Sequence, residues 1–264
     1  MKILSLAQLI SLKNKTAIVT GGAMGIGFGV ARRLAEAGAN VVIADIDGEV
    51  GKAAAKELKN ESWQAAFVKT DVSREQDIQA AVDFTVKTYG GIDILVNNAG
   101  IYPTIPIRQM KPADFEKVLA VNLKSVFLST KAAAEQMIQQ KRGGKIINIT
   151  SIDALHPSSV GLAVYDASKH GVWGFTKNTA LEFAPHNIQI NAIAPGGIAT
   201  PGTGAGKAIP PAMEAIIKKF IQKIPMKRMG DPDDIGKVAL FLASDLSSYM
   251  TGSQVVVDGG VLLS

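Results

Sequence analysis

The sequence contains no cysteine, and this absence removes several classes of chemistry. Without thiols the chain has no disulfide framework, no thiolate nucleophile and no cysteine-ligated metal, and we expect no metal site of any kind. A chain without disulfides is compatible with the reducing cytoplasm, which is where we expect the protein to be.

The sequence also lacks the long apolar run that a membrane helix requires. No stretch approaches the roughly 20 consecutive apolar residues needed to cross a bilayer. The first residues are apolar in part, but Gln8 and Ser11 interrupt them, no small-residue cleavage site follows, and a strand is expected directly after Lys15. We therefore expect a soluble protein with no membrane partner.

Positive charge is present but not concentrated in a nucleic-acid-binding pattern. The formal net charge of +5 is spread along the chain, with no arginine-rich arm and no interleaving of basic and aromatic residues, which argues against a nucleic-acid partner. The one local cluster is residues 218–228, where Lys219, Lys223 and Lys227 fall on one helical face. A solvated helix face is favoured there. Binding of an anionic substrate by this cluster is left open.

A glycine-rich stretch, TGGAMGIG at residues 20–27, joins a strand-like run at 16–19 to a helix-like run at 26–37. Glycines permit positive φ at a turn, close approach of a ligand to the main chain, and close packing of helix against strand. The helix N-terminus presents unpaired N–H groups and a partial positive charge, which suits a pyrophosphate. The stretch predicts a dinucleotide-binding turn, with a loop that binds nothing as the alternative.

Strand and helix alternate along the rest of the chain. Strands too apolar to face water on either side imply a parallel sheet between layers of helices, and no shift in composition marks a linker. We therefore predict one α/β domain over residues 1–264, with residues 1–14 as an N-terminal extension. The further strands are expected at 40–45, 65–69, 94–96, 145–149, 188–193 and 255–257, and the further helices at 49–59, 74–89, 112–140, 165–184 and 233–243.

Asp45 ends the expected strand 40–45 and lies 18 residues beyond Gly27. A dinucleotide-binding fold places in this position the acid that accepts hydrogen bonds from the adenosine ribose. The carboxylate would repel a 2′-phosphate, and Met24 offers no cation within the turn, so the cofactor is expected to be NAD rather than NADP. The alternative role for Asp45 is to cap the following helix, and the two roles can coexist.

Tyr165 and Lys169 stand four residues apart, so their side chains share one face of a helix. A free phenol with a pKa of about 10 is a poor base, but a neighbouring ammonium favours phenolate. The pair is thus a candidate proton donor and acceptor. Such spacings are common by chance. Ser151 just after a strand and Asn122 within a helix, in the same domain as the glycine turn, make this one significant.

Taken together, these residues resemble the short-chain dehydrogenase/reductase family, from about Lys13 to the C-terminus. The resemblance implies a single-domain Rossmann fold with a doubly wound seven-stranded parallel sheet, helices on both faces, and a nicotinamide cofactor. It also implies a homo-oligomer, and the apolar helices expected around 114–140 and 165–184 favour a homo-tetramer over a dimer. The matching motifs are residues 20–27, Asp71-Val72, NNAG at 97–100, VNL at 121–123, Ser151, YDASK at 165–169, Pro195-Gly196 with Thr200, and VDGG at 257–260.

The resemblance assigns a role to each member of a catalytic tetrad. Tyr165 would exchange a proton with the substrate oxygen, and Ser151 would hydrogen-bond that oxygen. Lys169 would lower the Tyr165 pKa and hold the nicotinamide ribose, while Asn122 would support a water that links Lys169 to solvent. The implied cofactor-binding residues are Gly21, Met24, Gly25, Ile26, Gly27, Asp45, Asp71, Val72, Asn98, Ala99, Gly100, Tyr165, Lys169, Pro195, Gly196, Ile198 and Thr200.

The substrate side is less defined. The interval from Ser151 to Tyr165 is one residue longer than is common in the family, and it contains Asp153 and His156. Both residues are candidates to line the pocket and bind substrate hydroxyls, which would favour a sugar or polyol; the alternative is that they are loop residues facing solvent. The Gly- and Pro-rich segment 196–225 leaves the sixth strand at its carboxyl end and is expected to be a substrate lid.

These inferences lead to a primary function and two alternatives. We predict an NAD(H)-dependent oxidoreductase that acts on a secondary alcohol or ketone, with a sugar or polyol as the first candidate substrate. One alternative is a 3-oxoacyl reductase, which Asp45 disfavours because such reductases commonly use NADPH. The other is a non-catalytic nucleotide-sensing protein, which would have no need of the tetrad. The sequence does not name the substrate or the direction of the reaction, since one fold hosts many chemistries.

Overall fold

A computed structural model describes residues 3–157, 159–203 and 211–264 of the chain. Its centre is a sheet of seven parallel strands in the order β3-β2-β1-β4-β5-β6-β7. The order runs outward in both directions from β1, so the sheet is doubly wound and the prediction of a seven-stranded parallel sheet is confirmed. The strands are β1 Thr16–Thr20, β2 Asn40–Asp45, β3 Ala65–Lys69, β4 Ile94–Asn97, β5 Gly144–Ile149, β6 Ile188–Pro195 and β7 Gln254–Val257.

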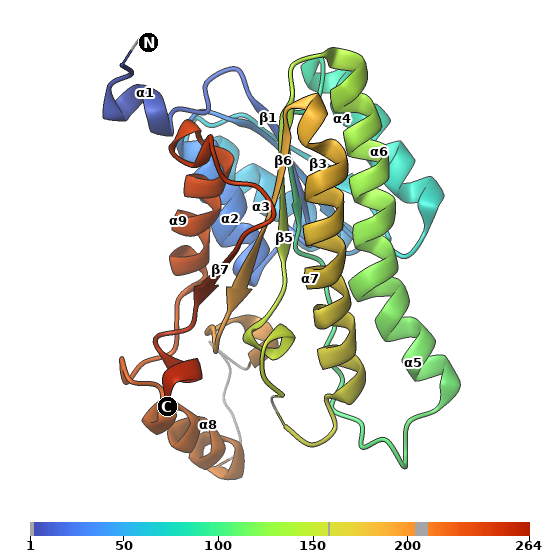
Figure 1. Ribbon diagram of the computed structural model, residues 1–264, viewed down its shortest axis with the longest axis vertical. Helices are drawn as coiled ribbons and strands as arrows, with labels where there is room; N and C mark the ends of the chain where they lie inside the picture. Colours follow the sequence, from blue (N-terminus) through green and yellow to red (C-terminus); the bar gives the residue numbers. More distant parts are fainter. Residues whose placement is uncertain (1–2, 158, 204–210) are drawn as a thin grey trace.

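Helices cover both faces of the sheet, as predicted (Figure 1). One face carries α2 (Gly25–Glu36), α3 (Gly48–Asn60) and α9 (Pro232–Ala243). The other carries α4 (Glu75–Tyr89), α6 (Ser125–Gln140) and α7 (Ala163–Phe183). A short helix, α1 (Leu6–Ile10), precedes β1, and α8 (Pro211–Lys223) lies beyond the carboxyl ends of the strands, at the bottom of Figure 1. Within the described ranges, no helix is long and apolar enough to cross a membrane.

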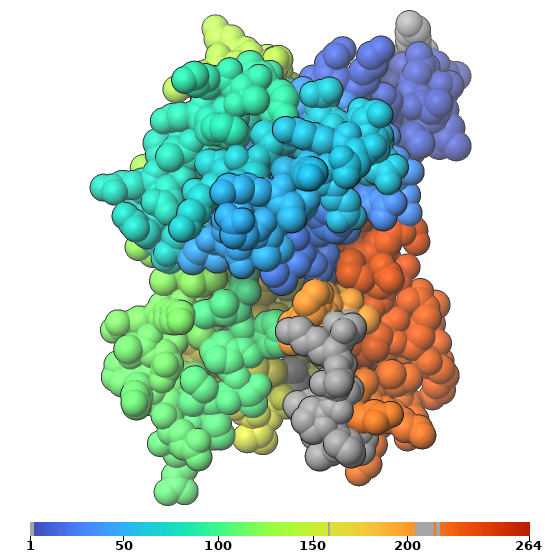
Figure 2. Space-filling view, turned by 180° about the vertical axis from the view of Figure 1, so that it is seen from behind, coloured from blue at the N-terminus to red at the C-terminus, as the bar shows by residue number. Residues whose placement is uncertain are grey.

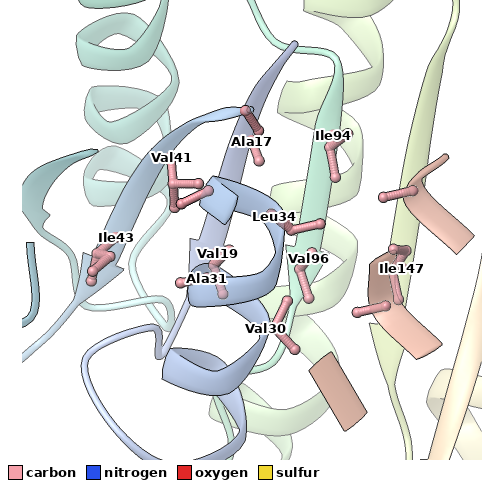
Figure 3. Packing of buried hydrophobic residues seen from close by; sticks show 14 of the residues in the cluster. Ala17, Val19, Val30, Ala31, Leu34, Val41, Ile43, Ile94, Val96 and Ile147 are labelled. Atoms are coloured by element: carbon pink, nitrogen blue, oxygen red, sulfur yellow. The ribbon is translucent and has the colours of Figure 1, made fainter. Parts of the chain in front are cut away.

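Alternate residues along each strand enter two separate cores, because successive side chains in a strand point to opposite faces. Val19 packs in the core beneath α2, whereas its neighbour Ile18 packs in the core beneath α4 and α6. Figure 3 shows Val30, Ala31 and Leu34 of α2 directed at the strand residues. Strands buried on both faces explain the apolar runs in the sequence.

The helix that follows the glycine turn is fixed in place by the last helix of the chain. At Gly236 of α9, a Cβ atom would come within 2.6 Å of the carbonyl oxygen of Gly29 in α2, so only glycine allows this close approach. Arg33 adds an ion pair with Asp233, with Nη2 of the arginine 2.7 Å from Oδ2 of the aspartate. Helix α9 thereby sets the position of α2 and of the turn before it.

The expected single helix at 112–140 is divided in the structure. Helix α5 (Pro112–Leu119) leads into a π-helical turn, η1 (Ala120–Lys124), which is followed by α6. Asn122 lies in this wider turn, where its side chain is bonded to a neighbouring loop. Such π-turns occur often at functional sites.

The predicted lid, residues 196–225, is described only in part. A 3₁₀ turn, η4 (Pro201–Thr203), follows β6, and α8 forms the second half of the segment. Residues 204–210 lie outside the described part of the chain.

Candidate active site

A cleft of about 790 Å³ lies at the carboxyl ends of the strands. Most of its lining residues lie at or just after the ends of strands β1 to β6, at the edge where open α/β sheets bind ligands. Seen from behind, the surface is recessed where the blue and cyan N-terminal part of the chain meets the green and orange segments (Figure 2). Every residue predicted to bind the cofactor lies in the lining of this cleft. Their roles in binding stay a prediction.

The glycine turn forms one end of the cleft and has the shape of a phosphate cradle. Gly21 and Gly25 have φ of 60° and 56°, in the left-handed region that favours glycine. A Cβ atom on Gly27 would lie 2.1 Å from the carbonyl oxygen of Gly21, so this position has no room for a side chain. The N-cap of α2, Met24, makes no side-chain capping hydrogen bond, which leaves the first N–H groups of the helix for a phosphate.

Asn98 holds the turn against β4. Its Nδ2 donates to the carbonyl oxygens of Thr20, at 2.9 Å, and Gly21, at 3.0 Å. Its backbone N–H donates to Oγ1 of Thr20 at 3.0 Å. The NNAG motif thus fixes the conformation of the glycine turn from the neighbouring strand, a contribution that sequence reasoning did not predict.

Asp45 is bonded both to the glycine turn and, through Oδ1, to the backbone N–H of Asp47 at 3.1 Å, but it is not the N-cap of the next helix. Its Oδ2 accepts a hydrogen bond from the backbone N–H of Ala23 at 3.0 Å. The N-cap of α3 is Asp47, whose Oδ1 accepts from two backbone N–H groups of the first helical turn. The helix-capping alternative for Asp45 is therefore wrong. Asp45 and Asp47 both line the cleft, and the cations in the described part of its lining are Lys117 and Lys169.

An apolar part of the cleft lining lies near Asp45 and Asp47. Val72 is buried and packs with Leu128, Ala99 and Val121. The carboxylate of Asp71 is occupied by the next residues of its own loop, because Oδ1 accepts from both the backbone N–H and the hydroxyl of Ser73. These flat apolar surroundings suit an adenine ring.

Ser151, Tyr165 and Lys169 come together at the other end of the cleft. Ser151 follows β5, and its side chain lies close enough to the phenol of Tyr165, in the first turn of α7, to act on the Tyr165 pKa in the lowering direction. Lys169 lies one turn later, with Nζ 5.7 Å from the Tyr165 ring centroid. The lysine is only 4% exposed, and Nζ donates to the carbonyl oxygen of Ile149 at 2.8 Å.

Burial controls the proton affinities of this group. It raises the pKa of Tyr165 above its ordinary value, and the nearby Asp153, Tyr102 and Asp166 act in the same direction. Burial also lowers the pKa of Lys169 to about 8. The net shift of the Tyr165 pKa is upward because desolvation of the phenol outweighs the other effects, and the expectation that Lys169 itself lowers this pKa stays a prediction.

Both polar atoms of the Asn122 side chain make hydrogen bonds within the protein. Its Oδ1 accepts from the N–H of Ile101 at 2.8 Å, and its Nδ2 donates to Ile101 O at 2.8 Å and to Ser168 Oγ at 3.1 Å. It is 1% exposed and does not line the cleft. The amide therefore ties the π-turn to α7 and to the loop after β4, and the predicted link through water to Lys169 stays a prediction.

The two candidate substrate residues have different positions. Asp153 lines the cleft, and its Oδ2 accepts a hydrogen bond from Ser151 Oγ at 3.0 Å. His156 is exposed and is not part of the lining; its Nδ1 lies 2.9 Å from the carbonyl oxygen of Pro157. The prediction that His156 lines the pocket is wrong, because the chain after the 3₁₀ turn η2 (Ile152–Ala154) leads it into solvent.

Sequence reasoning missed Tyr102, which also lines the cleft. Its ring meets that of Tyr165 edge-on, with 6.1 Å between centroids. No motif marks Tyr102 apart from its place two residues after NNAG. Leu162 lines the same end of the cleft.

The basic cluster at 218–228 is not part of the cleft lining in the described structure. Arg228 pairs with Asp234 at 2.8 Å, and Lys227 donates to the carbonyl oxygen of Gln222 at 2.7 Å. Among the described residues, no group of three or more His, Asp or Glu side chains is arranged to hold a metal ion.

Comparison with known proteins agrees with this geometry. The profile of a family described as Enoyl-(Acyl carrier protein) reductase matches residues 21–262. A short chain dehydrogenase/reductase of Aspergillus oryzae is 41% identical over 97% of this chain and 98% of its own length. The 3-oxoacyl-(acyl-carrier-protein) reductase FabG of Aquifex aeolicus is 40% identical over 96% of this chain and 99% of its own.

A solved structure gives the same result for the fold. The crystal structure of a short-chain type dehydrogenase/reductase from Mycobacterium marinum superposes with a TM-score of 0.92 and 34% identity, over 98% of this chain and 100% of that one. The level of identity, the near-complete coverage and the placement of the predicted motifs around one cleft support one conclusion. The chain belongs to the short-chain dehydrogenase/reductase family and is an oxidoreductase that acts on CH–OH or keto groups.

Proposed function

We propose that the protein is an NAD(H)-dependent oxidoreductase that interconverts a secondary alcohol and a ketone, with a sugar or polyol as the substrate. The observation that carries the proposal is the grouping of Ser151, Tyr165 and the buried Lys169 in one part of the cleft. This group lies at one end of a cleft whose other end is the glycine turn and Asp45.

The residues at the turn fit a dinucleotide. Positive φ at Gly21 and Gly25, and the lack of room for a Cβ at Gly27, make a cradle of backbone that a pyrophosphate can approach. Asp45 would bind the adenosine ribose, Val72 would contact the adenine, and Lys169 would hold the second ribose. When bound, the nicotinamide supplies or accepts the hydride.

The protein residues handle the proton. In the oxidative direction Tyr165 accepts the proton of the substrate hydroxyl, and in the reductive direction it returns that proton to the carbonyl oxygen. Ser151 orients the same oxygen by a hydrogen bond. The buried ammonium of Lys169, with a pKa near 8, supplies a positive charge close to the oxygen on which negative charge develops.

The cofactor preference is proposed to be NAD over NADP. Support comes from the two carboxylates, Asp45 and Asp47, in the lining after β2, where a 2′-phosphate would meet like charge. Purified protein should therefore show a higher kcat/KM with NAD than with NADP for any alcohol it oxidises. Comparable values with the two cofactors would contradict the proposal.

A screen of secondary alcohols and polyols with NAD, followed by NADH absorbance, tests the reaction. The expected result is oxidation of at least one polyol, abolished in Tyr165→Phe while NADH still binds. A second candidate function is supported by the 40% identity to a 3-oxoacyl reductase. Faster reduction of an acetoacetyl thioester with NADPH than oxidation of any polyol with NAD would favour that second candidate.

We further propose a single catalytic domain with residues 1–14 as an extension and 196–225 as a substrate lid, assembled as a homo-tetramer in the cytoplasm. Exposed aromatic side chains at Phe115 and Phe127, together with Leu181 on α7, support association through α5, α6 and α7. Light scattering at micromolar concentration should report four subunits, and a monomer or dimer mass would contradict the tetramer.

A further inference from the structure

Asp153 and Ser151 form a closed pair of hydrogen bonds at the substrate end of the cleft. Ser151 Oγ donates to Asp153 Oδ2 at 3.0 Å, and the backbone N–H of Asp153 donates back to Ser151 Oγ at 3.1 Å. A serine hydroxyl has a single proton, so this arrangement commits it to the carboxylate. Of the two lone pairs of Oγ, one already accepts from the Asp153 N–H, so one is left to accept a hydrogen bond from Tyr165 or from a substrate hydroxyl.

The second carboxylate oxygen of Asp153, Oδ1, accepts no hydrogen bond from any described residue, and the side chain lines the cleft. The charged and titratable groups that face it are Asp166 and Lys169 of α7, together with His156 from its own loop. Burial raises the pKa of Asp153 above its ordinary value, while the hydrogen bond from Ser151 and the positive charge of Lys169 act in the opposite direction. Asp153 Oδ1 can therefore accept a hydrogen bond from a donor group of a ligand in the cleft.

Tyr102 lines the same end of the cleft, beside Tyr165. Its ring stands edge-on to Tyr165, and its hydroxyl reaches the turn after β6, where a Cβ on Gly202 would lie 2.7 Å from it. The tyrosine thus offers an apolar ring surface near the reacting centre. A carboxylate and an aromatic ring that both lie near Tyr165 in the cleft lining suit a carbon skeleton bearing hydroxyl groups.

We propose that Asp153 and Tyr102 form a subsite for the carbon next to the reacting carbon, and that this subsite selects a neutral hydroxyl there. The preferred substrate is then a vicinal diol, or the matching hydroxyketone, and a substrate with a carboxylate on the neighbouring carbon is rejected. A hydroxyl donates to Oδ1, whereas an anion meets like charge in a partly buried site. This inference rests on the proposed function and adds the substrate class to it.

Three cyclic probes that differ only on the neighbouring carbon test the subsite. They are cyclohexanol, 1,2-cyclohexanediol and 2-hydroxycyclohexanecarboxylate, each oxidised with NAD. For the wild-type protein we expect kcat/KM for the diol to exceed that for cyclohexanol by roughly tenfold or more, because a lost hydrogen bond to a charged group costs about that factor. The carboxylate should be the poorest of the three. These wild-type ratios need no variant, so they do not depend on the folding of any substitution.

Variants of Asp153 then separate charge from hydrogen bonding. In Asp153→Ala the ratio of diol to cyclohexanol should fall to within about twofold, since the acceptor is gone. In Asp153→Asn the acceptor oxygen remains but the charge does not, so kcat/KM for the carboxylate should rise by roughly tenfold while part of the diol preference is kept. Tyr102→Ala should raise KM for both neutral probes alike and leave their ratio unchanged. A ratio of two substrates is insensitive to the fraction of active protein.

Asp83→Asn is the matched control, because this exposed carboxylate on α4 is hydrogen-bonded to Gln79 and does not line the cleft. It should leave all three ratios at their wild-type values. Equal kcat/KM for diol and cyclohexanol in the wild type, or equal losses for all three probes in Asp153→Ala, would overturn the subsite while the proposed function stands. Failure to oxidise these probes and every alcohol of the wider screen would instead refute the proposed function.

Discussion

The two ends of the cleft are built from different parts of the polypeptide. At the cofactor end the shape is made by backbone: positive φ at Gly21 and Gly25, and the absence of room for a Cβ at Gly27. At the substrate end it is made by side chains, and Ser151, Asp153 and Tyr102 arrive there from two separate loops. A binding site built from backbone, as at the cofactor end, accepts one kind of ligand. A site built from side chains, as at the substrate end, can change its substrate specificity by single substitutions.

The ends also differ in electrostatics. The glycine turn acts through backbone N–H groups and carries no buried charge of its own. The substrate end keeps an ammonium at Lys169 that is almost fully buried, together with a phenol whose pKa burial raises. Catalytic groups held in unfavourable surroundings lower stability, so substitutions at the two ends should separate binding, chemistry and stability.

The largest expected effect is a loss of turnover on changing Tyr165 at the substrate end, with cofactor binding unchanged. Tyr165→Phe removes one hydroxyl and keeps the ring, so turnover should fall by a factor of roughly 10² or more while fold and NADH affinity stay nearly the same. Steady-state kinetics with NADH binding by fluorescence measures both. A Tyr165→Phe protein with most of its activity would place the proton relay elsewhere.

The next effect belongs to the cofactor end. Asp45→Ser removes like-charge repulsion of about 1–3 kcal/mol from a partly buried site, so the ratio of kcat/KM for NAD to that for NADP should fall by roughly 10- to 100-fold. Asp47→Asn is the comparison, since it keeps a capping side chain on α3. An equal fall in the Asp47 variant would mean that Asp45 is not the discriminating acid.

The third effect is on stability. Removing the buried ammonium of Lys169 should abolish activity but raise the free energy of unfolding. The pKa of Lys169 is about 8 in the folded chain and 10.5 in its ordinary state, so the folded protein carries the full cost of the buried charge below pH 8. This cost is relieved as pH rises from 8 toward 10.5, and wild-type stability should rise across that window.

Lys169→Met should therefore be inactive yet more stable than wild type at pH 7. We expect a net gain of about 1–2 kcal/mol in the free energy of unfolding, after subtracting the lost hydrogen bond to Ile149 O. Urea denaturation measures it, with the exposed Lys87→Met as control, for which a change below about 0.5 kcal/mol is expected. A clear loss of stability in Lys169→Met would show that the buried ammonium is a favourable part of the fold.

The smallest effect is a shift in a pH profile. The proposed mechanism needs the ammonium form of Lys169, so kcat/KM for alcohol oxidation should fall as pH rises through an apparent pKa of about 8. Asp153 raises the pKa of Lys169 and of Tyr165, so Asp153→Asn should move this limb to lower pH, by less than about one unit. A limb that stays in place would indicate a different titrating group.

The cofactor end could be predicted from sequence because its determinants are local. A glycine turn between an apolar strand and a helix, and an acid at the end of the next strand, are fixed by residue type and spacing within one βαβ unit. The parallel sheet followed from strands that are apolar on both faces. All of these features are present in the structure, and Asp45 is bonded to the turn it was predicted to accompany.

The substrate end could not be predicted in the same way because its contacts join distant segments. Nothing near Asn122 in sequence shows that its amide would be saturated by Ile101 and Ser168. The exposure of His156 depends on how the chain leaves η2, and the place of Tyr102 depends on its packing against Tyr165. Desolvation of the tyrosine likewise depends on the whole surrounding fold, and so the direction of its pKa shift was missed.

The crossing of α2 and α9 has a consequence for how the protein is made. Arg33 and Asp233 are separated by 200 positions, and Gly29 touches Gly236 across the same crossing. The ribosome releases the dinucleotide turn among the first residues, but the helix that fixes it emerges only after β6 and α8. Contacts of such long range form late and slow the folding of a domain. A nascent chain would therefore be unable to form a complete nucleotide site until α9 had been synthesised.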